Sequence, residues 1–243
     1  MPVLALQGVR GGTGATSITA ALAWALQQLG ETAIAMDWSP ANQLRLHFNT
    51  PQRETRGWVR AALDGEAASQ AALRYPDGPD FIPFGQLSGE ERRRFYSDPA
   101  PFVTPWLQHL AALRSQYRWV LLDLPGDEQP WLQPVYAQVD RLIQLLTADG
   151  NCHMRLHQSG AAVPPLYLLN LFNANSKVQQ DLHQLWIGTL RNLIPLLIHR
   201  DEALSEALLN KQPVGEYRPH ALASEEIVTL ANWLIMHTGG EAA

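Results

Sequence analysis

A glycine-rich turn near the start of the chain has the residue types of a phosphate-binding loop. It runs from Gly8 to Ser17 with the sequence GVRGGTGATS, between an apolar segment and a stretch with helical spacing. A glycine loop that enters a helix directs unpaired backbone amides and the positive end of the helix dipole toward one point, where an anion binds. The hydroxyl of Thr16 or Ser17 can reach a magnesium ion held by the same phosphates. The turn therefore predicts a nucleotide ligand.

Two kinds of nucleotide site use a turn of this type, and the first is a dinucleotide-binding fold. The dinucleotide-binding fingerprint has a glycine turn followed, about 20 residues later, by an acid that holds a ribose hydroxyl. Gly12-Thr13-Gly14 and Asp37, at the end of the second apolar segment, match this spacing. Ser17, however, stands where the third glycine of that fingerprint is expected. The sequence also lacks the Tyr-x-x-x-Lys pair of short-chain reductases. The dinucleotide alternative is therefore the weaker one.

An acid at the end of another apolar segment favours a nucleoside-triphosphate site. Asp123 follows the apolar run Trp119–Leu122, as Asp37 follows Thr32–Met36. In an open α/β sheet the carboxyl ends of the strands meet at one edge, so both acids can support a magnesium ion beside the phosphates. A plainer alternative for each acid is a helix cap or the partner of a nearby cation.

The predicted elements that position these residues form a doubly wound α/β sheet. The apolar segments expected to be buried strands are Val3–Val9, Thr32–Met36, Phe81–Phe84, Trp119–Leu122, Leu142–Leu146, Leu166–Leu171 and Leu193–Ile198. Helical spacing predicts helices at Ala15–Leu29, Thr104–Tyr117, Ser176–Leu190, Glu202–Leu209 and Ser224–His237. This alternation indicates a mostly parallel sheet with helices on both faces, in a single domain spanning residues 1–243. The proline-rich region 49–105 is expected to be an irregular insertion, either solvated or partner-binding, and residues 238–243 a frayed tail.

Composition and charge argue against several classes of protein. The chain has 18 Lys and Arg against 23 Asp and Glu, and its net charge of −5 disfavours a nucleic-acid partner. Cys152 is the single cysteine, which excludes a disulfide scaffold and indicates a reducing, cytoplasmic compartment. The sequence has no cationic leader and no apolar run long enough to cross a bilayer, so we expect neither export nor direct membrane insertion.

The turn Arg10-Gly-Gly-Thr-Gly-Ala-Thr16 resembles the deviant Walker A loop, K-G-G-x-x-K-[ST], of the MinD/ParA family of dimerising P-loop ATPases. The likeness continues through Asp37-Trp-Ser-Pro40 and Asp123-Leu-Pro-Gly126 to the segments 198–201 and 211–217. The stretches LQGVRGG, DGNCHMRLHQ and IHRDEAL are most similar to the branch of the family that serves bacterial cellulose biosynthesis. The resemblance implies ATP and Mg²⁺ as cofactors and a homodimer with ATP sandwiched at its interface. It also implies small accessory subunits of the cellulose secretion system as partners, which would recruit a cytoplasmic protein to the inner-membrane cellulose synthase.

The resemblance also assigns roles to individual residues. Asp37 would orient water or the metal shell, and Thr16 and Asp123 would support the magnesium ion. The residues implied to hold the nucleotide are Gly11, Gly12, Thr13, Gly14, Ala15, Thr16, Ser17, Asn170, Arg200, Pro213, Val214 and Tyr217.

Three of the implied assignments have a plain structural alternative. Asn170 would contact the adenine edge, because an amide both donates and accepts, but it is also a suitable loop cap. Arg200 would border the adenine, or else form a local ion pair with Asp201. Arg155 would face the partner's nucleotide across the dimer, or else be an ordinary surface arginine.

The sequence departs from the family at the two lysines of the loop. Arg10 replaces the signature lysine and keeps the charge needed to reach the partner's nucleotide, whereas Ala15 replaces the lysine that neutralises the phosphates within the same subunit. Loss of one preorganised electrostatic donor typically raises the barrier by about 2.7–4 kcal/mol. We therefore expect slow or negligible ATP hydrolysis. The alternatives are an active positioning ATPase and a nucleotide-independent scaffold.

Overall fold

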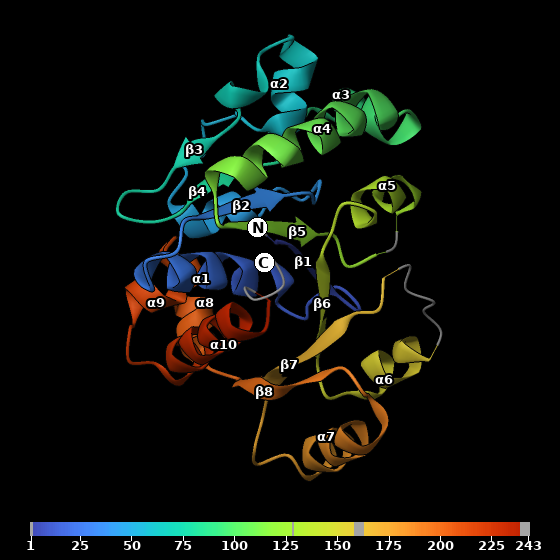
Figure 1. Cartoon of the computed structure of the whole chain (residues 1–243), viewed down its shortest axis with the longest axis vertical. Helices are drawn as coiled ribbons and strands as arrows, with labels where there is room; N and C mark the ends of the chain where they lie inside the picture. The colour runs from blue at the N-terminus through green and yellow to red at the C-terminus, as the bar shows by residue number, and fades with distance from the viewer. Residues whose placement is uncertain (1, 128, 158–162, 239–243) are drawn as a thin grey trace.

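The computed structural model describes residues 2–127, 129–157 and 163–238, which form a twisted sheet covered by helices on both faces (Figure 1). The strands are β1 (Val3–Gly8), β2 (Ala33–Asp37), β3 (Leu73–Arg74), β4 (Asp80–Ile82), β5 (Trp119–Leu124), β6 (Arg141–Leu146), β7 (Leu166–Phe172) and β8 (Leu193–His199). Their order in the sheet is β3-β4-β2-β5-β1-β6-β7-β8. All neighbouring pairs are parallel except β3 with β4. The prediction of a doubly wound, mostly parallel sheet is confirmed.

The central strands are almost entirely apolar because helices bury both faces of the sheet, and their few polar residues, such as Gln7 and Asp123, lie toward the carboxyl edge. Leu4 and Leu6 of β1 face one core, while Val3 and Ala5 face the other. The first face carries α1 (Ala15–Gln28), α8 (Glu202–Leu209), α9 (Val214–Tyr217) and α10 (Leu222–Thr238). The second carries α2 (Trp58–Asp64), α3 (Gly89–Ser97), α4 (Ala100–Gln116), α5 (Gln133–Tyr136), α6 (Gly150–Leu156) and α7 (Lys177–Thr189). Side chains on both faces of a central strand are therefore buried. For this reason the sequence of these strands does not alternate between apolar and polar residues.

The region 49–105 is more regular than its prolines indicate. It contains α2, α3 and the start of α4, and Trp58 is fully buried against Trp38 at a ring-centroid distance of 4.8 Å. Ser88 and Glu91 form a capping box at the start of α3, and Pro99 precedes the first turn of α4. Prolines at a helix start leave its hydrogen bonds intact, and α4 also continues past Pro105 in its interior. The region therefore completes the second core instead of leaving it.

Within the described ranges, none of the helices combines the length and apolar character of a bilayer span. Of the predicted tail at 238–243, Thr238 ends α10 and the remaining residues lie outside those ranges.

Candidate functional site

Three segments that are far apart in the sequence meet at the carboxyl edge of the sheet. β5 lies between β2 and β1, and the glycine-rich turn directly follows β1. Asp37, the last residue of β2, is in register with Asp123 of β5. The strand order therefore brings two acids and the turn to one place.

The backbone of the turn requires glycine at two positions. Gly12 and Gly14 have φ angles of 80° and 88°, a left-handed conformation that other residues adopt at a cost. Gly14 is the N-cap of α1, and its carbonyl accepts the amide of Ile18 at 3.0 Å. The amides that precede Ile18 in α1 have no carbonyl partner within the helix, and Gly11 and Gly12 are exposed. The turn can therefore present backbone donors to an anion.

Asp37 and Asp123 form a buried pair of acids. Their exposed fractions are 0% and 1%. Asp37 accepts the amides of Ser39 at 2.8 Å and Leu44 at 3.1 Å, whereas neither carboxylate oxygen of Asp123 has a hydrogen-bond partner. Burial raises the pKa of Asp37 to about 7, and the backbone hydrogen bonds offset this only in part. Burial, with the adjacent charge of Asp37, raises the pKa of Asp123 well above its usual range.

These groups fit a magnesium ion that binds together with phosphates. The hydroxyl of Thr16 lies close enough to Asp123 to favour its ionised form. Among the residues that the structure describes, no cluster of three or more His, Cys, Asp or Glu side chains is arranged as a metal cage. Mg²⁺ typically takes one or two carboxylates and completes its shell with water and phosphate oxygens. An unpartnered buried carboxylate beside an anion-binding turn supplies that incomplete set of ligands.

Arg10 is tied to its own chain. Its Nη2 donates to Asp149 Oδ2 at 2.6 Å and to Thr147 Oγ1 at 3.0 Å, and its Nη1 donates to the carbonyl of Gly11 at 2.7 Å. Asp149 also caps α6 by accepting the amide of Cys152 at 2.9 Å. Burial alone would raise the pKa of Asp149, but hydrogen bonds from Thr147 and Arg10 outweigh it and lower the pKa to about 2. In a single copy of the protein, Arg10 therefore links the turn to α6.

Asn170 braces the turn from β7. Its Nδ2 donates to the carbonyl of Thr13 at 2.8 Å, and a Cβ added to Gly14 would lie 2.6 Å from the same nitrogen. The side chain is 1% exposed, and its Oδ1 has no partner. Asn170 thus touches the glycine-rich turn, and its Oδ1 retains a free acceptor.

The other residues implied to border the nucleotide lie in two segments, one directly after β8 and one at α9. Arg200 is exposed at the end of β8, and Asp201 beside it accepts the amides of Ala203 and Ala223. Pro213, Val214 and Tyr217 belong to α9 and its cap. A Cβ on Gly215 of this helix would lie 2.8 Å from the Trp24 ring, so α9 packs against the second half of α1.

Arg155, the residue expected to face a partner subunit, lies exposed on α6. Its Nε donates to Asn151 Oδ1 at 3.1 Å.

Sequence reasoning missed several residues that shape the site. A Cβ on Gly126 would lie 3.0 Å from the backbone of Arg10, a tight contact, so glycine at this position favours the close approach of the loop after β5 to the turn. Gln7 is buried in β1, where it donates to the carbonyl of Pro125 at 2.8 Å and accepts the Tyr136 hydroxyl at 3.0 Å. A glutamine inside an apolar run is a signal of such a role. For Asp149, the available signal was an acid directly after a strand and before a helix.

Comparison with known proteins places this chain in a family. A sequence model of the family described as cellulose biosynthesis protein BcsQ matches residues 1–235. The chain is 47% identical to cellulose biosynthesis protein BcsQ of Escherichia coli (strain K12) over 242 residues, covering 99% of this chain and 96% of that protein. It is 44% identical to BcsQ of Salmonella typhimurium over 243 residues, covering 99% of this chain and 97% of that protein.

Solved structures of similar fold come from the wider family. The septum site-determining protein MinD of Pyrococcus horikoshii, complexed with Mg-ADP, superposes with a TM-score of 0.77 at 20% identity, covering 100% of this chain and 98% of that chain. A ParA family ATPase of Chlorobium tepidum has a TM-score of 0.75 at 21% identity, covering 95% and 98%. The resemblance to MinD/ParA ATPases predicted from the turn is confirmed at the level of the fold.

Proposed function

The chain belongs to the family of cellulose biosynthesis protein BcsQ, and on that premise we propose that it is an ATP-binding, dimerising P-loop protein that regulates or assembles bacterial cellulose synthesis and secretion. Its ATP hydrolysis is slow or absent. Fold and family membership establish a cellulose-biosynthesis protein of the MinD/ParA fold, and the nucleotide-dependent action is our proposal.

The observation that carries the proposal is the unpartnered carboxylate of Asp123. A fully buried acid that the Thr16 hydroxyl stabilises only in part destabilises the protein when it is ionised, unless a proton or a cation compensates it. Asp37, Thr16 and the phosphate turn lie around it, so a Mg²⁺ ion carried in with a nucleotide satisfies the whole set.

Each group of the site has a distinct task in this proposal. The backbone amides from Gly11 to Ser17 would hold phosphate oxygens, and Thr16 with Asp123 would support the magnesium ion. Mg²⁺ supplies charge neutralisation for the phosphates when it is bound. Asp37, whose side chain is fully buried, would hold a water molecule at the metal shell.

Two features favour binding over turnover. Ala15 leaves the turn without a cation of its own, so charge that develops toward the terminal phosphate lacks stabilisation within the subunit. Arg10 is the arginine of the glycine-rich turn, and it is paired with Asp149. This ion pair must break before Arg10 can reach a second subunit. A nucleotide clamp therefore suits the site better than a fast ATPase.

The partners follow from family membership and charge. We propose a homodimer with ATP sandwiched at its interface, which binds small accessory subunits of the cellulose secretion system. The protein would act in the cytoplasm and reach the inner-membrane cellulose synthase through those partners. With a net charge of −5, we expect no nucleic-acid partner and no direct insertion into the membrane.

Mass in solution with Mg-ATP, Mg-ADP and no nucleotide tests the proposal. We expect the mass to double with Mg-ATP, while phosphate release stays far below about 1 s⁻¹, the low end of ordinary enzymes. Arg10→Ala should weaken the dimer, whereas Arg191→Ala, which removes an exposed arginine before β8, should not. An active positioning ATPase would release phosphate at ordinary rates. A scaffold would bind no nucleotide in calorimetry and would keep one mass throughout.

A further inference from the structure

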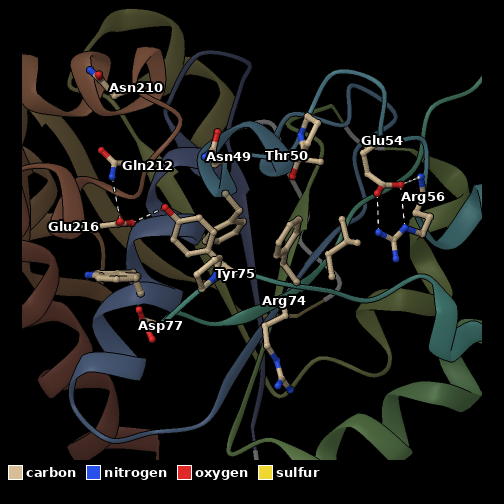
Figure 2. A pocket seen from close by; sticks show the side chains of 16 residues that line it. Asn49, Thr50, Glu54, Arg56, Arg74, Tyr75, Asp77, Asn210, Gln212 and Glu216 are labelled. Atoms are coloured by element: carbon tan, nitrogen blue, oxygen red, sulfur yellow. Dashed lines mark hydrogen bonds and ion pairs between the residues drawn. The ribbon is translucent and has the colours of Figure 1, made fainter.

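A cavity of about 740 Å³ opens on the molecule outside the candidate nucleotide site. Its walls come from α1, from the segment 48–56, from β3, β4 and the loop between them, and from α9 with the chain that precedes it (Figure 2). The glycine-rich turn, Asp37 and Asp123 are not among its lining residues. Its size lies within the range of about 300–1,000 Å³ that small-molecule sites occupy.

The inner wall of the cavity is aromatic. The rings of Phe48 and Phe81 lie 4.7 Å apart, and Tyr75 lies 5.4 Å from Phe48 and 6.1 Å from Trp24. Leu73 completes this wall. Phe48, Tyr75 and Phe81 are only 3%, 5% and 2% exposed, so they form a firm floor. Trp24 and Leu73 are partly exposed and offer apolar surface to a flat group.

The charges around the cavity leave negative charge uncompensated. Arg56 pairs with Glu54 at 2.7 Å, and Arg74 pairs with Asp80 at 3.1 Å, so both lining arginines are neutralised. The two other charged groups of the lining, Glu216 and Asp77, have no ion-pair partner among the residues that the structure describes. Glu216 accepts hydrogen bonds from two neutral groups, the Tyr75 hydroxyl at 2.6 Å and Gln212 Nε2 at 3.1 Å, which fix the direction of its carboxylate without cancelling its charge.

A second polar group lies on the opposite wall. Thr50 is 4% exposed, and its Oγ1 is buried with no hydrogen-bond partner. Figure 2 shows Thr50 across the aromatic side chains from Glu216. A buried hydroxyl with no partner is unfavourable, so a ligand that hydrogen-bonds to it gains affinity.

We propose that this cavity binds a small amphipathic cation: a flat apolar body with an ammonium or guanidinium group at one end and a hydrogen-bonding group at the other. The cationic end pairs with Glu216, and Asp77 adds negative charge to the same side of the cavity. The body lies against Phe48, Tyr75 and Leu73, and the far end meets the hydroxyl of Thr50.

The occupant is positioned to influence the nucleotide site. Trp24 lies on α1, which begins at the phosphate turn. Phe48 ends the 3₁₀ helix Leu44–Phe48, and the amide of Leu44 at the other end of this helix donates to Asp37 at 3.1 Å. His47 in the same short helix lies 3.4 Å from the hydroxyl of Ser17. A ligand that fixes these walls changes nucleotide affinity; this second part rests on the proposed function.

Tryptamine is a suitable probe because it has an indole body with a ring N–H and a terminal ammonium. Calorimetry should detect tryptamine binding to the full chain without nucleotide, about tenfold tighter than indole-3-propionate, which has the same ring with a carboxylate. Glu216→Gln should weaken tryptamine about tenfold, because a charge-assisted hydrogen bond becomes a neutral one. Glu225→Gln, an exposed acid on α10 that does not line the cavity, is the matched control. Thr50→Val should weaken tryptamine several-fold.

The outcomes separate the two parts of the proposal. Equal binding of tryptamine and indole-3-propionate, or no binding of either, overturns the cavity as a cation site. Equal losses in Glu216→Gln and Glu225→Gln overturn it as well. If tryptamine binds but does not change the affinity of a non-hydrolysable ATP analogue, the coupling is wrong. If the analogue itself does not bind, the proposed function fails, while the tryptamine result stands or falls on its own data.

Discussion

Replacing Asp123 by asparagine should stabilise the nucleotide-free protein at neutral pH and abolish its response to magnesium. The carboxyl of Asp123 is buried beside Asp37 without a hydrogen-bond partner, so keeping it ionised without a cation costs free energy. An amide of nearly the same shape has no charge to bury. The substitution therefore distinguishes two roles for Asp123. Removing a ligand-binding acid should raise the stability of the nucleotide-free protein, whereas removing a structural acid should lower it.

The size of the effect follows from the raised pKa values. Asp37 has a pKa of about 7 against 3.8 in the unfolded chain, so the folded state holds the extra proton between these values. Unfolding free energy must then fall as pH rises through this window, by about 4 kcal/mol for a shift of this size. The pKa of Asp123 is raised in the same direction, so it adds to this loss. Asp123→Asn removes that second contribution and leaves the burial of Asp37.

Urea denaturation followed by circular dichroism at pH 5 to 8, with EDTA present, measures the effect. The stability of Asp123→Asn relative to the original chain should increase with pH by more than about 1.4 kcal/mol, the equivalent of one pKa unit. Adding Mg-ATP should stabilise the original chain and not the variant. Asp181→Asn, which changes an exposed acid paired with Lys177, serves as the control and should show no such trend. A stability difference that stays constant with pH, or a magnesium response that survives in Asp123→Asn, would refute the reasoning.

Three further substitutions test the turn and its neighbours. Gly14→Ala should destabilise the protein by about 1–3 kcal/mol in chemical denaturation, because alanine is strained at a φ of 88° and its Cβ would collide with Asn170. The control Gly188→Ala, on α7 where no atom lies near the added Cβ, should stabilise the protein. Equal effects of the two substitutions would contradict this reasoning. Asp149→Asn keeps a side-chain oxygen to cap α6 but loses the charge that holds Arg10. The ATP concentration needed for dimerisation, measured by light scattering, should therefore fall, while the free energy of unfolding decreases by less than about 1 kcal/mol. An unchanged ATP requirement would show that the pair does not restrain Arg10. Ala15→Lys should raise phosphate release about a hundredfold by restoring a cation at the phosphates, and an unaltered rate would mean that the missing lysine is not what limits hydrolysis.

The sequence predicted the elements well where apolar runs are continuous. The segments 3–9, 119–122 and 166–171 correspond to β1, β5 and β7, since buried parallel strands leave a strong local pattern. The region 49–105 was harder, because its helices are short and depend on contacts such as that between Trp58 and Trp38, which exist only in the folded chain. Propensity and spacing within the segment do not contain that information.

The sequence by itself determined the glycine-rich turn and the two strand-end acids, because glycine spacing and an acid after an apolar run are local patterns. Only the tertiary structure decided which groups those residues meet. Arg10 pairs with an acid 139 residues away, and Asn170 reaches the carbonyl of Thr13 across 157 residues. The cavity beside Trp24 likewise joins segments from both halves of the chain. Such contacts depend on the order of strands in the sheet, which is set by the packing of the whole domain and not by any one segment.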